Sequence, residues 1–294
     1  MVYLRLLKYP GAKFVVIPDI EKVFNNSHCS LFIDVFGGSG SVSLNINFPN
    51  TIYNDIDPQF TNLFNSIKYK PGILYEALKI AATSNGEKNY RLNPVRNPSN
   101  EIGITGRDEG RKTGRDGTGS SKLQVNAGLA PGHRDVIDPL KAGNTIVRFS
   151  HSFGGLGNTY GTQREKSSGM YLKKTLYNFG KIRDIVRNWR IENQDFRDII
   201  RKYDSEEVFF YLDPPYPGKD WYNYNFTDND FLDLADFLKS MKGKYLLNLN
   251  ADDTSLIGVF GKPSFIRKYA NQNGPVPNRR DMMRSRSFYT NVHQ

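Results

Sequence analysis

The chain has few of the residues and segments that mark several protein classes. Cys29 is the only cysteine among 294 residues, so an internal disulfide cannot form, and we interpret Cys29 as a buried structural residue rather than a catalytic one. The four histidines are scattered at 28, 133, 151 and 293, which argues against a zinc site, and we expect no bound metal. No apolar run reaches the roughly 18 residues that a membrane span needs.

The N-terminal stretch MVYLRLLKYPGAK lacks the long apolar segment and the small-residue cleavage site of a signal peptide, because Arg5 and Lys8 interrupt its apolar residues. We therefore expect a cytoplasmic protein with no membrane partner. Hydrophobic residues make up 38% of the sequence, which is enough for a globular core.

Acidic residues are too few to balance the basic ones, and the net charge is +10. Residues 144–205 carry 12 Lys or Arg and 6 Asp or Glu, and residues 261–294 carry 7 and 1. Between them, residues 206–260 carry only 4 basic side chains and 10 acidic ones. Basic blocks of this kind favour a polyanion such as DNA or RNA as the partner, although a solvated basic face has the same composition.

Hydrophobic periodicity predicts strands that alternate with helices, which is typical of an α/β fold with a largely parallel sheet. The predicted strands are 30–36, 51–57, 207–212 and 244–250. One predicted helix starts at Pro58, and four others cover 71–82, 171–186, 196–200 and 227–239. In the last of these, Thr227 and Asp230 form a capping box. Residues 86–143 are Gly-rich and charged and have little apolar periodicity, so we predict a flexible insertion there, clearest over 97–143.

Three strand ends carry residues that suit a bound nucleoside. The strand at 30–36 runs into a glycine turn, Gly37, Gly38, Ser39 and Gly40, whose backbone can approach a ligand closely. Asp55 follows 18 residues after Gly37, where an acid can accept hydrogen bonds from ribose hydroxyls. Ligands of open parallel sheets bind beyond the carboxyl ends of the strands, so we expect these groups to share one site with Asp213.

Asp34 lies immediately before the glycine turn, and the turn GGSGSV departs from the dinucleotide pattern G-x-G-x-x-G. An acid at this point disfavours a pyrophosphate but tolerates a cation. S-adenosylmethionine is a nucleoside with a sulfonium and an ammonium group and no phosphate, so it fits the pattern better than a dinucleotide.

The stretch YLDPPYP ends a buried strand with an acid, two prolines and an aromatic ring. The amino group of adenine is a poor nucleophile because its lone pair is delocalised into the ring, and two hydrogen-bond acceptors would localise that lone pair. The Asp213 carboxylate can be one acceptor, and the Pro214 carbonyl, held outside regular structure by Pro214 and Pro215, can be the other. Tyr216 offers a face on which the base can stack.

These motifs resemble those of the Dam-type, or class alpha, DNA adenine methyltransferases, which methylate the 6-amino group of adenine with S-adenosylmethionine. The matching stretches, in chain order, are LLKYPGAK, DVFGGSGSV, YNDID, RFSHSFGGLGNTYG, ENQDFRDII and LDPPY. The resemblance implies a Rossmann-like methyltransferase sheet with an inserted, mainly helical DNA-recognition region. It also implies that one pocket for the cofactor is lined by Tyr9, Lys13, Asp34, Phe36, Asp55 and Asp213. Tyr9 stands where the family usually has tryptophan, and Ala12 replaces a glycine.

We therefore predict a catalytic domain over 1–85 and 205–294, the insertion over 86–143, and a target-recognition region over 144–204. Sequence reading is expected from Asn158, Tyr160, Thr162, Gln163 and Arg164. Phosphate contacts are expected from Lys173, Lys174, Lys181, Arg183, Arg279, Arg280, Arg284 and Arg286. His151 is expected at the surface or on a phosphate rather than as a catalytic base.

The sequence thus predicts a site-specific adenine methyltransferase that flips its target base out of double-stranded DNA. A separate cognate restriction endonuclease is a further expected partner. Two alternatives stay open: amino-methylation of cytosine or of RNA, and a catalytically silent DNA-binding homologue.

Overall fold

A computed structural model describes residues 3–9, 13–83, 137–151, 165–216, 224–251, 255–270 and 283–293. The strands are β1 (Leu31–Asp34), β2 (Thr51–Asn54), β3 (Arg190–Glu192), β4 (Val208–Leu212), β5 (Lys244–Asn250), β6 (Phe265–Ala270) and β7 (Met283–Thr290). The helices are the 3-10 turn η1 (Phe14–Val16), α1 (Ile17–Ser27), α2 (Ser43–Ile46), α3 (Pro58–Tyr69), α4 (Pro71–Ala81), α7 (Pro139–His151), α8 (Glu165–Val186), α9 (Phe196–Tyr203), α10 (Asp228–Ser240) and α11 (Ser255–Phe260).

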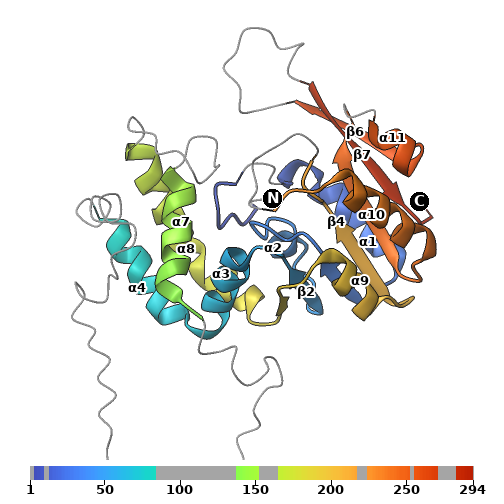
Figure 1. The fold of residues 1–294 in the computed structure, drawn as a ribbon. Coiled ribbons are helices and arrows are strands. Elements are labelled where there is room, and N and C mark those ends of the chain that lie inside the picture. Colours follow the sequence, from blue (N-terminus) through green and yellow to red (C-terminus); the bar gives the residue numbers. More distant parts are fainter. Residues whose placement is uncertain are drawn as a thin grey trace, which may run out of the picture.

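The strands form one seven-stranded sheet in the order β3-β2-β1-β4-β5-β7-β6 (Figure 1). The strands from β3 to β5 are parallel to their neighbours, and β7 is antiparallel to both β5 and β6. The expected α/β class with a Rossmann-like, largely parallel sheet is confirmed. The antiparallel β6–β7 pair at one edge was not predicted from the sequence.

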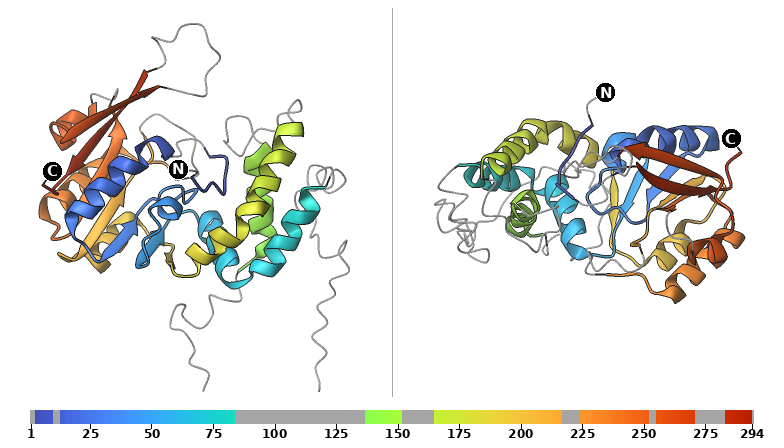
Figure 2. Two further views of the ribbon diagram at one scale, coloured as in Figure 1. Left: turned by 180° about the vertical axis from the view of Figure 1, so that it is seen from behind. Right: turned by 90° about the horizontal axis from the view of Figure 1, so that it is seen from above.

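The central strand β4 is buried on both faces because helices cover the sheet from both sides (Figure 2). Phe209 and Tyr211 belong to a core shared with α1, whose Phe24 lies 5.2 Å from the ring centroid of Phe209. Phe210 points the other way, into a core shared with α9, α10 and α11. The alternation of side chains along a strand explains why this one reads as an unbroken apolar run.

Helices α3, α4, α7 and α8 form a separate helical layer beside the sheet (Figure 1). Their core includes Trp189, whose ring stacks on Tyr53 of β2 at 5.5 Å and 6°. The predicted region boundaries need two corrections. Residues 139–143 are helical, because α7 begins at Pro139 and buries apolar side chains such as Ile146. β3 extends the sheet beside β2 and α9 packs on one face of that sheet, so both lie with the sheet rather than with the recognition region.

Two helix starts follow the local sequence as expected. Asp57 caps α3, its side chain accepting a hydrogen bond from the Gln59 amide at 2.9 Å. The capping box of α10 is present, with the Thr227 amide donating to the Asp230 carboxylate at 2.7 Å. Each cap satisfies backbone donors that the first turn of a helix leaves unpaired.

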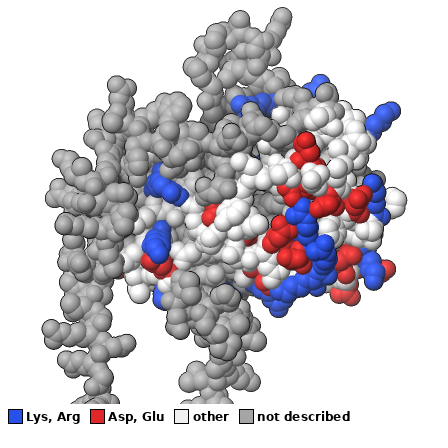
Figure 3. Space-filling model, viewed as in Figure 1, with Lys and Arg blue, Asp and Glu red and all other residues white. Residues whose placement is uncertain are grey.

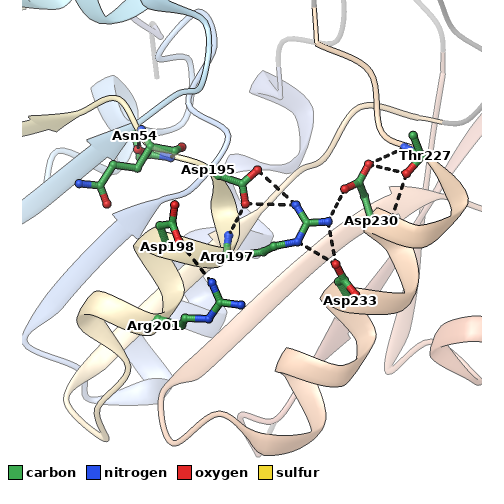
Figure 4. A network of polar contacts seen from close by, with 9 residues as sticks. Asn54, Asp195, Arg197, Asp198, Arg201, Thr227, Asp230 and Asp233 are labelled. Atoms are coloured by element: carbon green, nitrogen blue, oxygen red, sulfur yellow. Dashed lines mark hydrogen bonds and ion pairs between the residues drawn. The ribbon is translucent and has the colours of Figure 1, made fainter.

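Arg197 joins α9 to the first turns of α10, the two helices that cover one face of β4 (Figure 4). Its guanidinium donates to Asp233 at 2.8 Å, to Asp195 at 3.2 Å, and to Asp230. Figure 3 shows acidic and basic side chains interleaved over this part of the surface. The Arg197 side chain is 24% exposed and the Asp230 side chain 20%, so this pair is partly shielded from water.

The Arg197 network should contribute more to stability than an exposed ion pair on the same helix. We expect Arg197→Met to lower the free energy of unfolding by about 2–3 kcal/mol, because it leaves three carboxylates without their shared cation. Arg201→Met is the matched control. Its pair with Asp198 is exposed on both sides, so it should cost at most about 1 kcal/mol. Urea unfolding of both variants checks this, and equal losses would contradict the assignment.

Candidate active site

The predicted acids meet where the order of the parallel strands reverses. β1 continues to β2 on one side and lies beside β4 on the other, with Asp34 opposite Tyr211. Asp213 follows two residues later, so the ends of β1 and β4 bring both acids to one edge. Asp213 and Asp55 are each close enough to Asp34 to raise its pKa. Such reversal points are where open α/β sheets bind ligands.

The glycine turn serves both packing and access. A Cβ on Gly37 would lie 2.2 Å from the Tyr53 ring, and one on Gly40, at φ +67°, 2.5 Å from the Phe64 ring. These two glycines are therefore required for the turn to pack on the helical layer. Gly38, at φ +48°, differs because its Cβ would point to Tyr9 at 3.5 Å and towards Asp55. The missing side chain of Gly38 thus leaves a cradle between Tyr9 and Asp55.

Asp34 is a buried acid and Asp55 a half-buried one, and in both desolvation outweighs hydrogen bonding. Asp34 accepts a bond from the Ser43 hydroxyl at 2.6 Å, and Asp55 accepts from the amides of Gly38 at 2.7 Å and Asp57 at 2.8 Å. Burial nevertheless raises the pKa of each carboxyl to about 7. A cation placed beside these groups would favour their charged forms.

Tyr9 and Phe36, the aromatic residues predicted for the cofactor pocket, pack against different parts of the molecule. Tyr9 contacts Phe60 and Phe149 of the helical layer edge-on, at ring distances of 5.4 and 5.5 Å. Phe36 packs instead against Phe226, at 5.3 Å, and against α9. Ser39 is buried within the turn.

The Asp213 carboxylate is held at the end of β4 by three side chains from different parts of the chain. Its Oδ2 pairs with Lys13 Nζ at 2.5 Å, and its Oδ1 accepts from the Tyr216 hydroxyl at 2.8 Å and from Asn248 Nδ2 at 3.3 Å. Burial lowers the pKa of Lys13, an effect that Asp213 partly opposes. The side chains of Lys13 and Asp213 are only 6% and 16% exposed. Pro214, which follows Asp213, is buried.

Arg286, which was predicted as a phosphate contact, is buried at this site. Its side chain is 9% exposed on β7, donates from Nε to the Tyr269 hydroxyl at 3.1 Å, and lies over the Tyr216 ring at 4.9 Å. Burial, together with Asp213, raises the pKa of Tyr216 well above its usual value, so the phenol stays protonated and donates. The charged strand MRSRSFYT gave no sign that one of its arginines points inward.

Sequence reasoning also missed two asparagines that position the site. Asn248 lies fully buried on β5 and reaches both Asp213 and the Tyr211 hydroxyl. Asn54 clips three strand ends together, donating to the carbonyls of Val35 at 2.9 Å and Gln194 at 3.0 Å, and accepting from the Gln194 amide. The signal that could have identified them is a polar residue in an otherwise apolar strand, Asn248 in YLLNLN and Asn54 in TIYN.

The predicted DNA contacts are only partly described. Lys173, Lys174, Lys181 and Arg183 are exposed on α8, and Arg284 is exposed on β7. Asn158, Tyr160, Thr162, Gln163, Arg164, Arg279 and Arg280 lie outside the described residues. His151 was expected at the surface, but it is buried at the end of α7 with Nδ1 2.8 Å from the Val147 carbonyl. That contact indicates a structural role.

Two features are absent from the described parts of the chain, a membrane-spanning helix and a cluster of metal ligands. No helix there is long and apolar enough to span a membrane. No group of three or more His, Cys, Asp or Glu side chains there is arranged to hold a metal ion.

An open, largely parallel sheet here gathers a glycine turn, the acids Asp34 and Asp55, and an Asp-Pro-Pro-Tyr loop at one edge, where α/β sheets bind their ligands. Residues 9–259 match the family described as D12 class N6 adenine-specific DNA methyltransferase, and the chain belongs to that family. A DNA adenine methylase of Haemophilus influenzae is 45% identical over 62 residues, 21% of each chain. One from Vibrio cholerae is 30% identical over 87 residues, 29% of this chain and 31% of that protein. The matches thus span less than a third of these relatives.

The raised pKa of Asp34 predicts how the stability of the ligand-free protein depends on pH. The folded pKa of about 7 exceeds the usual unfolded value of about 3.9, so the folded state binds more protons between them. The stability that this group contributes is present below about pH 4 and is lost as the pH rises through about 7. We therefore expect Asp34→Asn to become steadily more stable relative to the natural protein between pH 5 and 8.

Urea midpoints measured across this range check the expectation, with Asp198→Asn on the surface of α9 as the control for removing an acid. A difference between Asp34→Asn and the natural protein that stays constant with pH would contradict the burial of an uncompensated carboxyl.

Proposed function

We propose that the protein transfers a methyl group from S-adenosylmethionine to the 6-amino group of adenine in DNA, after the base has left the duplex. The observation that carries this proposal is the position of Asp213. Its carboxylate ends β4 beside Asp34, next to the glycine turn, and is held by Lys13 and Tyr216. A hydrogen-bond acceptor is thereby fixed close to the place where the strand ends favour a nucleoside.

The residues of the pocket fit a cationic nucleoside. Asp34, which is buried, and Asp55, which is half-buried, both have raised pKa values, so a nearby sulfonium or ammonium group would favour their ionised forms. The cradle that Gly38 leaves between Tyr9 and Asp55 suits a ribose, which Asp55 can bind through lone pairs that its two backbone bonds do not use. When bound, S-adenosylmethionine supplies an activated methyl group.

Asp213 prepares the amine by accepting a hydrogen bond from it. In the ligand-free protein Oδ1 of Asp213 accepts from Tyr216 and Asn248, whereas Oδ2, paired with Lys13, keeps a further lone pair for the incoming amino group. The Pro214 carbonyl is the proposed second acceptor. Together they favour a pyramidal nitrogen whose lone pair can attack the methyl carbon, and the surplus proton leaves afterwards.

Tyr216 and Arg286 support the base. Arg286 and Lys13 both lie over the Tyr216 ring, at 4.9 and 5.6 Å, and a flipped adenine would stack on the part of the ring that these cations leave open. Base–aromatic stacking is worth about 1–3 kcal/mol and offsets much of the few kcal/mol that base flipping costs. The double-stranded DNA itself would be held by the exposed cations of α8. A separate cognate restriction endonuclease stays a prediction.

Removal of the Asp213 carboxylate tests the proposed function. We expect Asp213→Ala to lower methyl incorporation into DNA by about 10³-fold or more, because the acceptor that activates the amine is lost. DNA affinity should stay within about threefold. Incorporation of labelled methyl groups and fluorescence anisotropy with duplex DNA measure the two effects, and Asp198→Ala is the control. A fully active Asp213→Ala protein would refute the assignment.

Substitution of two arginines on β7 should affect different steps, methyl transfer in one case and DNA binding in the other. Arg286 is buried against Tyr216, whereas Arg284, two residues earlier, is exposed. We expect Arg286→Met to lower the methyl transfer rate at saturating DNA at least tenfold and to leave the salt dependence of DNA binding unchanged. Arg284→Met should weaken binding and reduce the slope of log K against log salt by about 1. The reverse pattern would show that Arg286 is a phosphate contact after all.

A further inference from the structure

A cavity of about 340 Å³ lies between the N-terminal segment and α8, apart from the cluster of Asp34, Asp55 and Asp213. It is lined by Tyr3, Arg5, Phe14, Tyr171, Lys174 and Thr175. Ligand pockets commonly measure about 300–1,000 Å³, so this one suits a small group rather than a large molecule. All views show the N-terminal segment between the sheet and the helical layer (Figures 1 and 2).

Two hydroxyl groups of the cavity wall have no hydrogen-bond partner among the described residues. The oxygens of Tyr171 and Thr175 are buried and unpaired, and the Thr175 residue is only 1% exposed. The two residues lie one helical turn apart on α8, so both hydroxyls come from the same face. An unpaired buried hydroxyl costs about 1–3 kcal/mol, and a ligand with acceptor oxygens would recover that loss.

The charged residues that line the cavity are both cations. The Arg5 guanidinium is positioned over the Phe14 ring at 4.5 Å, and Phe14 in turn stacks on Tyr3 at 5.8 Å. Lys174 lies on the exposed side of α8, next to Thr175. Burial raises the pKa of Tyr171, which Arg5 partly opposes, so its phenol is a proton donor at neutral pH. Donors and cations without a lining acid select an oxyanion.

We propose that this cavity binds a phosphate group and that, in the working complex, the group is a phosphodiester of the substrate DNA. The second part rests on the proposed function. Phe14 directly follows Lys13, the partner of Asp213, so the chain connects one wall of the cavity directly to the reacting centre. A phosphate held there would fix the strand whose base reaches Asp213. Tyr177 and Lys181 continue the exposed face of α8 beyond Lys174, with Tyr177 82% exposed.

Removal of the two hydroxyls tests the proposal, because stability and affinity should move in opposite directions. In Thr175→Val and Tyr171→Phe, the ligand-free protein should melt at a higher temperature, since an unpaired polar group is gone. DNA affinity, measured by anisotropy without cofactor, should fall about tenfold for each variant. Thr145→Val is the matched control. Its hydroxyl already donates to the Lys141 carbonyl at 3.1 Å, so it should lower the melting temperature and leave DNA affinity unchanged.

A second arm separates DNA from free phosphate as the source of the group. Inorganic phosphate should raise the melting temperatures of the natural protein and of Lys173→Gln by similar amounts. It should raise the melting temperature of Lys174→Gln less, because Lys174 lines the cavity and Lys173 does not. Stabilisation by phosphate with unchanged DNA affinity of the hydroxyl variants would overturn the assignment to DNA. Unchanged DNA affinity with no effect of phosphate would overturn the site altogether. Both arms omit cofactor, so they do not depend on whether the protein transfers methyl groups.

Discussion

The site depends on one buried ion pair, between Lys13 near the start of the chain and Asp213 at the end of β4. Buried ion pairs are weak contributors to stability, because desolvation cancels most of the attraction. Removal of one partner, however, leaves an uncompensated charge and costs about 3–5 kcal/mol. The pair therefore fixes the direction of one carboxylate more than it stabilises the fold. Tyr216 and Asn248 complete that arrangement from a loop and a neighbouring strand.

The same physical logic connects the two halves of the site. β1 and β4 are hydrogen-bonded neighbours, so the acids at their ends are brought together by the sheet itself. Burial then raises the pKa of Asp34 and Asp55, which prepares the pocket for a cation. On the other side, the Tyr171 and Thr175 hydroxyls of α8 are buried without partners among the described residues. The proposed cofactor pocket and the proposed phosphate cavity would thus place a cation and an anion on the two sides of Lys13.

Local sequence patterns predicted the elements that depend on local interactions. The strands β1, β2, β4 and β5 and the helices α3 and α10 follow from apolar periodicity, proline and capping residues. The acids met as expected because parallel strands end at one edge. β7 was not predicted, because its pairing with β5 joins segments far apart in the sequence. That pairing sets Arg286 opposite Asn250 and brings it against the Tyr216 ring, a contact that periodicity does not encode. Helix α7 was not predicted, because glycine and charged residues before and within it obscured its apolar face.

The most direct test of the account is nucleoside analysis of DNA after incubation with the protein and S-adenosylmethionine labelled at the methyl group. If Asp213 activates the amino group of a flipped adenine, the label will appear in N6-methyladenine. Label in N4-methylcytosine, or none in DNA while RNA is methylated, would contradict the assignment of adenine in DNA as the substrate. Bound DNA with no label in any nucleoside would contradict the enzymatic role of Asp213 itself.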